Sequence, residues 1–201
     1  MKKVIVVGAT GIIGKSVCHL LKSQRYEVIE ASRSSGIIVD IGNIDSIKAM
    51  YDKIGAFDAL VSTTGKVNFK ALIEMSEEDF RFGLQNKLMG QVNLVQEGLK
   101  HINNNGSFTL TTGILNREPI ALGASAAVVN AALEGYIKAA SLELRQSVRI
   151  NAVSPTVITE ALSSYAPFFP GFKPVDAEEA AAAYLKSIAG IETGKIFSVG
   201  Y

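Results

Sequence analysis

Cysteine, histidine and tryptophan are scarce in this sequence. Its 201 residues include one cysteine, two histidines and no tryptophan. The single cysteine, Cys18, excludes an internal disulfide, and we therefore expect a cytoplasmic protein in a reducing compartment. His19 and His101 have no cysteine or acidic cluster near them in the sequence, which predicts that there is no metal site.

Excess charge and long hydrophobic runs are also missing. The formal net charge is +1, and the basic residues are scattered, which argues against a nucleic acid or an anionic membrane as partner. No apolar run reaches the ~18 residues that a membrane span requires. Three glycines break the apolar run of the initial MKKVIVVGATGIIGK and no cleavage site follows, so we do not expect a signal peptide.

Short apolar runs alternate with helical patterns along the whole chain. The runs predict strands at 4–7, 27–31, 36–40, 59–62, 106–112, 148–153 and 195–200. Apolar residues at helical spacing predict helices between them, the longest at 77–100 and 123–146, and Ser76 with Asp79 predicts a capping box at the start of the first. This alternation predicts an α/β fold, a single doubly wound Rossmann domain over residues 1–201 with about seven parallel strands flanked by helices on both faces.

A glycine-rich turn separates the first predicted strand from the first predicted helix. In VIVVGATGIIGKSV three glycines let the backbone turn tightly and approach a pyrophosphate, while the helix N-terminus adds free N–H groups and a partial positive charge. A tight turn that serves packing alone is the alternative. The predicted cofactor-binding residues of this turn are Gly8, Thr10, Gly11, Ile12, Ile13 and Gly14.

The end of the second predicted strand indicates which dinucleotide would bind. An acidic residue there would hold the ribose 2′-OH of NAD, but this sequence has Ser32, Arg33 and Ser34, and Glu30 is expected to point into the sheet. An arginine among serines is well suited to a 2′-phosphate. We therefore predict NADP(H) in preference to NAD(H), with a solvated surface arginine as the alternative interpretation.

With these motifs the chain resembles the short-chain dehydrogenase/reductase family, and the resemblance extends nearly from end to end. The GATGIIG spacing is that of its extended and divergent members, and VDIGNID at 39–45 is similar to its aspartate segment after the third strand. LVSTTG at 60–65 stands where the family has an Asn-Asn-Ala-Gly turn. The resemblance implies cofactor contacts from Asp40, Ile41, Ser62, Thr63, Thr64 and Gly65.

Segments similar to the family's catalytic region follow. Asn86 matches the helix asparagine of the catalytic set, and FTLTTG places Thr112, or alternatively Thr111, at the catalytic serine. RINAVSPTVITE at 149–160 resembles the Asn-x-Val-x-Pro-Gly turn beside the nicotinamide. This turn implies cofactor contacts from Pro155, Val157 and Thr159.

The Tyr-x-x-x-Lys pair that the family uses for proton transfer has no match. Aligning NAALEGYIKAASLEL at 130–144 places Asn130 at the lysine and Ala126 at the tyrosine. Alanine cannot transfer a proton, whereas asparagine can hydrogen-bond the nicotinamide ribose but carries no charge. General acid–base catalysis contributes about 10² to 10⁴ in rate, so we expect altered or reduced catalysis.

Other groups could replace the missing tyrosine. Tyr165 is the candidate substitute acid, in a short loop at 155–175 that we expect to form a lid over the substrate, with a packing or surface tyrosine as the alternative. Ser125 and Thr112 could relay a proton through water. Lys66 and Lys87 are expected to face solvent.

The resemblance implies an NADP(H)-dependent oxidoreductase that transfers a hydride to or from a small carbonyl or alcohol substrate, with altered or reduced catalysis. The alternative is a non-catalytic NADP(H)-binding module that senses redox state, and a purely structural fold with an empty pocket is a third interpretation. Because the helices at 77–100 and 123–146 are the family's usual pairing surfaces, we expect a homodimer or homotetramer.

Overall fold

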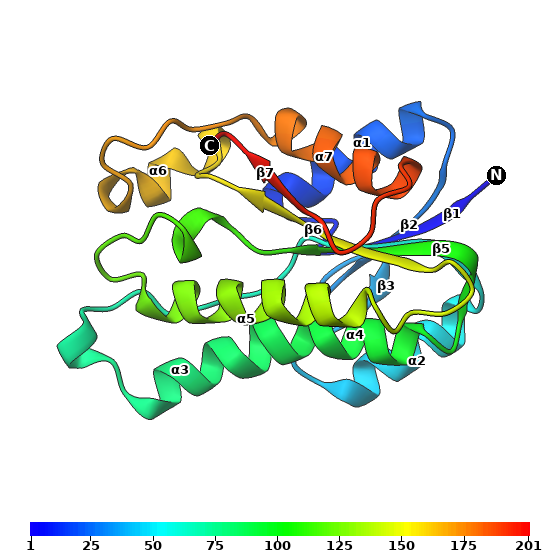
Figure 1. Ribbon diagram of the computed structural model, residues 1–201, viewed down its shortest axis with the longest axis horizontal. Coiled ribbons are helices and arrows are strands. Elements are labelled where there is room, and N and C mark those ends of the chain that lie inside the picture. Colours follow the sequence, from blue (N-terminus) through cyan, green and yellow to red (C-terminus); the bar gives the residue numbers. More distant parts are fainter.

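Seven parallel strands form one continuous sheet in the computed structural model, which describes residues 1–201 (Figure 1). The strand order is β3-β2-β1-β4-β5-β6-β7, and every neighbouring pair is parallel. The predicted α/β fold with seven parallel strands is therefore confirmed. The strands are β1 (Lys3–Val7), β2 (Glu27–Ser32), β3 (Ile37–Ile38), β4 (Phe57–Ser62), β5 (Ile102–Thr111), β6 (Arg149–Pro155) and β7 (Ile196–Val199).

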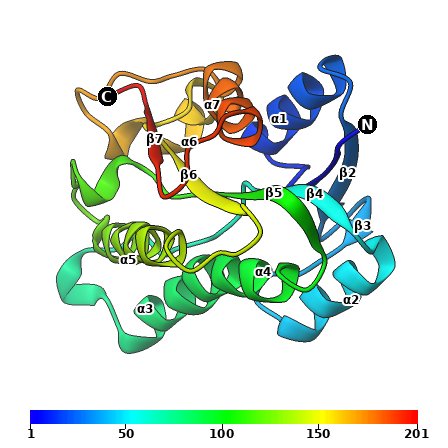
Figure 2. The ribbon, with the colours of Figure 1, turned by 45° about the vertical axis from the view of Figure 1, so that its right-hand side comes forward.

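Helices cover both faces of the sheet (Figure 2). One face carries α1 and α7, and the other carries α2, α3, α4 and α5. A short helix, α6, lies in the loop after β6. The helices are α1 (Ile12–Ser23), α2 (Ile44–Ile54), α3 (Glu77–Gly83), α4 (Gly90–Gly98), α5 (Ala124–Ala140), α6 (Leu162–Tyr165) and α7 (Ala177–Ala189).

Alternation along the strands divides the interior into two cores. In β1, Val4 and Val6 pack on the α1 and α7 side with Tyr184, whereas Ile5 packs on the opposite side with Leu133 of α5. Successive side chains of a strand point to opposite faces, so a strand covered on both faces must be apolar throughout. This explains why unbroken apolar runs predicted the strands.

The helix predicted at 77–100 begins as expected but is not continuous. The capping box between Ser76 and Asp79 is confirmed, and Asp79 also accepts hydrogen bonds from Lys70 and Asn68. The bond from Lys70, followed by the backbone bond of Ser76, holds the pKa of the Asp79 carboxyl well below its usual range. A π-helical turn at Leu84–Met89 separates α3 from α4, a feature that often marks functional sites.

Three further sequence-based expectations differ from the structure. The third strand, predicted at 36–40, is only two residues long, and the helix predicted at 123–146 ends at Ala140. Glu30 does not point into the sheet interior, because its carboxylate reaches out to Lys22 of α1, 2.5 Å away, in an exposed ion pair. Each difference lies at the edge of the sheet or at the end of a helix, where local patterns are weakest.

The strand order reverses between β1 and β4. From β1 the chain builds outward through β2 and β3, and it then returns to place β4 on the other side of β1. The loops that follow β1 and β4 therefore diverge and leave a crevice at the carboxyl ends of the strands, which is where ligands bind in such folds. Further loops contribute short 3₁₀ turns at Leu72–Glu74, Ile114–Asn116, Thr159–Ala161 and Ala166–Phe168.

Replacing Tyr51 by Phe tests how strongly α2 is held against α4. The fully buried Tyr51 hydroxyl donates to the Leu94 carbonyl oxygen at 2.5 Å, and burial raises its pKa well above the usual value, which keeps the donor proton in place. We expect Y51F to lower the free energy of unfolding by about 1–3 kcal/mol, because the buried carbonyl loses its partner. Urea unfolding, monitored by circular dichroism, measures this change in the free energy of unfolding.

Tyr136→Phe is the matched control for this prediction. This substitution also removes a tyrosine hydroxyl group. The hydroxyl of Tyr136, on α5, only accepts a 3.4 Å hydrogen bond from Gln96. The expected change in the free energy of unfolding is less than about 0.5 kcal/mol. Equal effects of the two substitutions would contradict a stabilising role of the buried bond.

Candidate functional site

Two connected cavities open at the carboxyl edge of the sheet. The first is a cleft of about 260 Å³ over the ends of β1 and β2, and the second, of about 590 Å³, lies over the ends of β5 and β6. Gly65 and Lys66, on the loop after β4, line both cavities and join them. An elongated molecule that enters the first cavity can therefore extend into the second.

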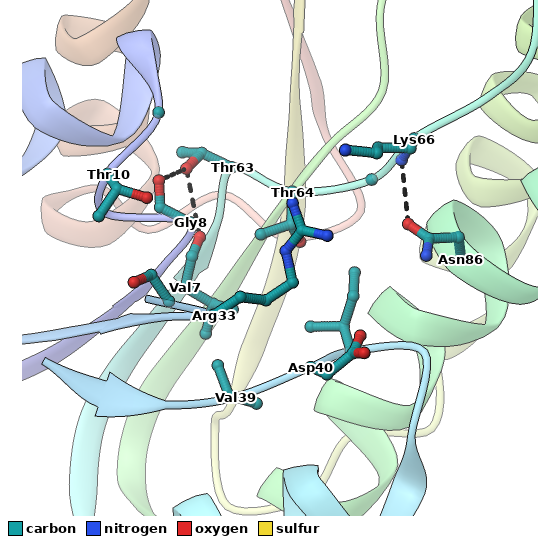
Figure 3. Close-up of a pocket in the computed structure, with 14 residues that line it drawn as sticks. Val7, Gly8, Thr10, Arg33, Val39, Asp40, Thr63, Thr64, Lys66 and Asn86 are labelled. Atoms are coloured by element: carbon teal, nitrogen blue, oxygen red, sulfur yellow. Dashed lines mark hydrogen bonds between the residues drawn. The ribbon is translucent and has the colours of Figure 1, made fainter. Parts of the chain in front are cut away.

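The glycine-rich turn forms the floor of the first cleft. Gly8 has φ +89°, and a Cβ atom on Gly14 would overlap the carbonyl oxygen of Gly8. The Thr63 hydroxyl fastens the turn to β4 by contacting the carbonyl oxygens of Val7 and Gly8, each at 3.2 Å (Figure 3). Side chains are thus excluded where the backbone must come close, and the turn is held rigidly at the edge of the cleft.

Helix α1 begins at this turn without a cap of its own. Its N-cap residue, Gly11, provides no side-chain hydrogen bond, and its first turn holds no acidic residue. The first N–H groups of a helix have no partner within the helix, and the helix dipole places partial positive charge there. Such an end favours an anion, and a phosphate group fits the chemistry of this donor set.

A free cation stands on the opposite side of the cleft. Arg33 extends from the end of β2 into the middle of the residues that line it, and it makes no ion pair (Figure 3). The hydroxyl of the buried Ser32 is already engaged, since it accepts hydrogen bonds from the N–H groups of Ser34 and Ser35. Ser32 therefore shapes the loop that presents Arg33, and the guanidinium remains available to a ligand.

Most of the predicted cofactor residues line one of the two cavities. The first cleft is lined by Gly8, Thr10, Gly11, Ser32, Arg33, Asp40, Ile41, Thr63, Thr64 and Gly65. The second is lined by Ile13, Asn130 and Pro155, in addition to Gly65. Neither cavity is lined by Ile12, Gly14, Ser34, Ser62, Val157 or Thr159. Contacts of these residues with a cofactor remain predictions.

Asn86 lies in the π-helical turn and shapes the junction of the two cavities. Its side-chain oxygen accepts a 3.1 Å hydrogen bond from the backbone N–H of Lys66 (Figure 3). The widened turn brings the next residue, Lys87, to the inner side of the helix, so that its side chain enters the second cavity. Asn86 therefore lines the first cleft while its neighbour lines the second.

Lys87 does not face solvent, and the sequence-based expectation for it is wrong. Its ammonium group donates to the side-chain oxygen of Asn130 at 2.8 Å and to the carbonyl oxygen of Thr112 at 3.0 Å. Burial lowers the pKa of Lys87 to about 8. The sequence carried no clear signal for this position, because residues 84–89 form a π-helical turn in which the spacing of a regular α-helix does not hold.

Gly65 leaves room for the side chain of Lys87 because it has no Cβ atom. Gly65 has φ +121°, and a Cβ atom there would overlap the aliphatic part of Lys87. Lys66, on the next position of the loop, is exposed as expected. The lysine stem thus passes against bare backbone before its charged end reaches the cavity wall.

The hydroxyl groups expected to relay a proton are engaged or remote. Thr112 is buried, and its hydroxyl faces the Glu134 carboxylate at 3.5 Å, whereas the Thr111 hydroxyl bonds the Ser62 carbonyl oxygen on the opposite side of β5. Ser125 is fully buried, has no hydrogen-bond partner and does not line the second cavity. The relay through Ser125 is therefore not supported by its position.

The remaining wall of the second cavity is mostly apolar. Ala126 presents its methyl group beside Asn130, and Tyr165 from α6 packs edge-on against Phe69 with ring centroids 6.1 Å apart. Asn130 is 2% exposed and also donates to the Gly113 carbonyl oxygen at 3.1 Å. No tyrosine of the chain is followed by lysine four residues later, so no Tyr-x-x-x-Lys pair exists elsewhere in it.

No three side chains of histidine, cysteine, aspartate or glutamate come together in a group that could hold a metal ion. No helix has both the length and the apolar character needed to cross a membrane. Cys18 of α1 is buried in the core on the α1 and α7 side of the sheet, and this burial raises the pKa of its thiol to about 11.

Two solved structures with the same fold are also similar to this chain in amino-acid sequence. The protein lin1944 from Listeria innocua is 45% identical, with a TM-score of 0.97 over 99% of this chain and 100% of that one. A small-chain dehydrogenase whose crystal structure is in complex with NADPH is 29% identical, with a TM-score of 0.88 over 98% of this chain and 96% of that one.

Sequence comparisons point in the same direction. The bifunctional ribulose 5-phosphate reductase/CDP-ribitol pyrophosphorylase Bcs1 of Haemophilus influenzae is 29% identical over 97% of this chain. The match covers 42% of that protein, so the chain spans less than half of its length. Residues 15–193 match the family model described as enoyl-(acyl carrier protein) reductase. With this match, the seven-stranded sheet and the glycine-rich cleft, the chain belongs to the short-chain dehydrogenase/reductase family.

Proposed function

We propose that this protein is an NADP(H)-dependent oxidoreductase that reduces a small carbonyl compound or oxidises the corresponding alcohol. The observation that carries the proposal is the unpaired Arg33 facing an uncapped helix N-terminus across one cleft. A family that binds nicotinamide cofactors supports the dinucleotide, and the two separate anion sites support its phosphorylated form. The NADPH complex of the 29% identical dehydrogenase is consistent with this choice.

The dinucleotide would extend across both cavities. The pyrophosphate would lie on the turn from Gly8 to Gly11, where the helix N-terminus offers N–H donors and no side chain obstructs the backbone. The adenosine would occupy the first cleft beside Asp40 and Ile41, with its 2′-phosphate against Arg33. When bound, the nicotinamide supplies or accepts a hydride.

The substrate would occupy the second cavity. Its wall includes Phe69, Ile114 and Phe169, which exclude water from part of the surface, and polar groups are concentrated around Lys87 and Asn130. We propose that the loop at 155–175 acts as the lid, since it contributes Pro155, Tyr165 and Phe169 to this cavity. The size of the cavity, about 590 Å³, suits a small molecule next to the nicotinamide ring.

A second candidate function is a redox sensor that binds NADP(H) without turnover. The observation in its favour is the methyl group of Ala126 in the cavity wall, where the family resemblance implies the catalytic tyrosine. A protein that only senses the nucleotide needs the cleft and the helix N-terminus but no proton donor. The two functions therefore differ in turnover and agree in cofactor binding.

Arg33→Gln tests the 2′-phosphate contact. We expect the dissociation constant for NADPH to rise about 10-fold to 100-fold, because a hydrogen-bonded ion pair is lost, while that for NADH stays unchanged. Isothermal titration calorimetry with each nucleotide measures both constants.

The control for R33Q is Arg145→Gln, at an exposed position outside both cavities. This substitution removes one positive charge as well, and it should leave both dissociation constants unchanged. Equal losses of affinity for NADPH and NADH in R33Q would contradict a contact with the 2′-phosphate.

Turnover and thermal stability separate the enzyme from the sensor. With NADPH at about 100 times its dissociation constant, we expect a stabilisation of about 2.7 kcal/mol and slow, carbonyl-dependent loss of NADPH absorbance over a panel of aldehydes and ketones. Thermal unfolding and absorbance are recorded on the same samples. Stabilisation without consumption would favour the sensor, and the absence of both would contradict either function.

A further inference from the structure

Lys87 brings an ammonium group into the wall of the second cavity. An ammonium group has three N–H donors, and two of them are used by the side-chain oxygen of Asn130 and the carbonyl oxygen of Thr112. The stem of the side chain is packed against Gly65, which has no Cβ atom to obstruct it. One donor is therefore left for an oxygen atom that enters the cavity.

No carboxylate in the cavity neutralises this ammonium group. The other titratable side chains that line the cavity are Lys66, on the loop after β4, and Tyr165, on α6. The residues that β5, α5 and β6 contribute to the cavity are neutral. Glu134 lies one helical turn beyond Asn130 on α5, but its carboxylate accepts two 2.8 Å hydrogen bonds from Arg117. Two neutral acceptors replace part of the hydration of this half-buried ammonium group, and no opposite charge compensates for the rest.

The protonation equilibrium of Lys87 reflects this environment. Burial lowers its pKa to about 8, so that at neutral pH the ammonium form predominates and the amine form is accessible. A general acid is most effective when its pKa lies near the working pH, because it must hold a proton and also release it. An ordinary exposed lysine, with a pKa of about 10.4, meets only the first condition.

We propose that Lys87 is the proton donor for carbonyl reduction, entering the cavity from a different helix than the tyrosine that the family uses. The proposal rests on the function proposed above. In the reaction, the carbonyl carbon receives the hydride of the reduced nicotinamide while the carbonyl oxygen takes a proton from Nζ of Lys87. The products are the alcohol, the oxidised nicotinamide and a neutral amine, which regains its proton from water; alcohol oxidation runs the same transfers in reverse.

Asn130 is a positioning residue in this arrangement. Its oxygen accepts from Lys87, and its amide nitrogen donates to the Gly113 carbonyl oxygen, so the side chain holds the ammonium group in a fixed place. Because Asn130 is neutral, it orients the ammonium group without raising the pKa as a carboxylate would.

The two other titratable groups at the cavity are less suited to the role. The Tyr165 side chain is 40% exposed and packs on Phe69, on the loop side of the cavity. Lys66 is exposed at the junction of the cavities, where water competes for its charge. Neither bonds to Asn130 or to the end of β5, as Lys87 does.

Four variants test the proposal. Lys87→Met keeps most of the length of the side chain but removes the ammonium group, and Lys87→Arg keeps a charge that is not released near neutral pH. Asn130→Asp places a carboxylate at the atom that contacts Lys87. Lys138→Met, at an exposed position on α5 outside both cavities, is the matched control and should behave as the wild type.

Kinetics should separate these variants. We expect kcat for carbonyl reduction to fall about 10²-fold to 10⁴-fold in both K87M and K87R, with a smaller change in KM. In the wild type, kcat should fall as pH rises through about 8, because only the ammonium form donates. This limb should be absent in K87M and should move up by about 1–3 pH units in N130D, since a carboxylate stabilises the ammonium form.

An NMR titration gives a readout that does not depend on turnover. In protein labelled with ¹³C at lysine Cε, one resonance should titrate near pH 8, and it should be missing from K87M and shifted to higher pH in N130D. If K87M fails to fold, as judged by its thermal unfolding, K87R and N130D provide the same comparison.

Several outcomes would overturn the proposal. Wild-type kcat and pH dependence in K87M would do so while leaving the oxidoreductase function intact, as would titration of Lys87 at the ordinary value of about 10.4. A loss of kcat in Tyr165→Phe with none in K87M would assign the proton to Tyr165. Wild-type protein that binds NADPH but reduces no carbonyl compound would overturn the proposed function and the donor role together.

Discussion

Close approach to glycine backbone after β1 and β4 sets the geometry of the cleft and of the neighbouring cavity. Gly14 sits against the Gly8 carbonyl group, and Gly65 sits against the stem of Lys87. The first contact keeps the N-terminus of α1 at the edge of the cleft, and the second admits a charged side chain to the neighbouring cavity. Because helices cover both faces of the sheet, its carboxyl edge is where these features meet a ligand.

Two cations without acidic partners stand at opposite ends of this edge, and their surroundings make them different. Arg33 is exposed and offers a planar fork of donors, which suits recognition of a phosphate. Lys87 is half-buried in the wall of the second cavity, and desolvation lowers its pKa to about 8. The same formal charge therefore lies in two different environments at the two ends of this edge.

The alanine-rich segment at 119–135 need not mark a lost active site. On α5 a methyl group and an amide occupy the cavity wall at Ala126 and Asn130, and no ionisable residue lies between Glu118 and Glu134. The charge comes instead from the π-helical turn between α3 and α4, across a contact between residues 43 positions apart in the chain. The wall of the second cavity therefore carries a charged group although α5 supplies none.

Local patterns along the chain were enough to predict the seven strands, the capping box at Ser76 and the glycine-rich turn from Gly8. These follow from apolar alternation, from spacing within one helical turn and from the conformational freedom of glycine. Tertiary structure decided the π-helical turn, the short third strand and the burial of Lys87, for which the sequence-based expectation was wrong. Whether a lysine lies in water or in a cavity depends on residues that fold against it from distant segments, and the desolvation that sets its pKa exists only once they are in place.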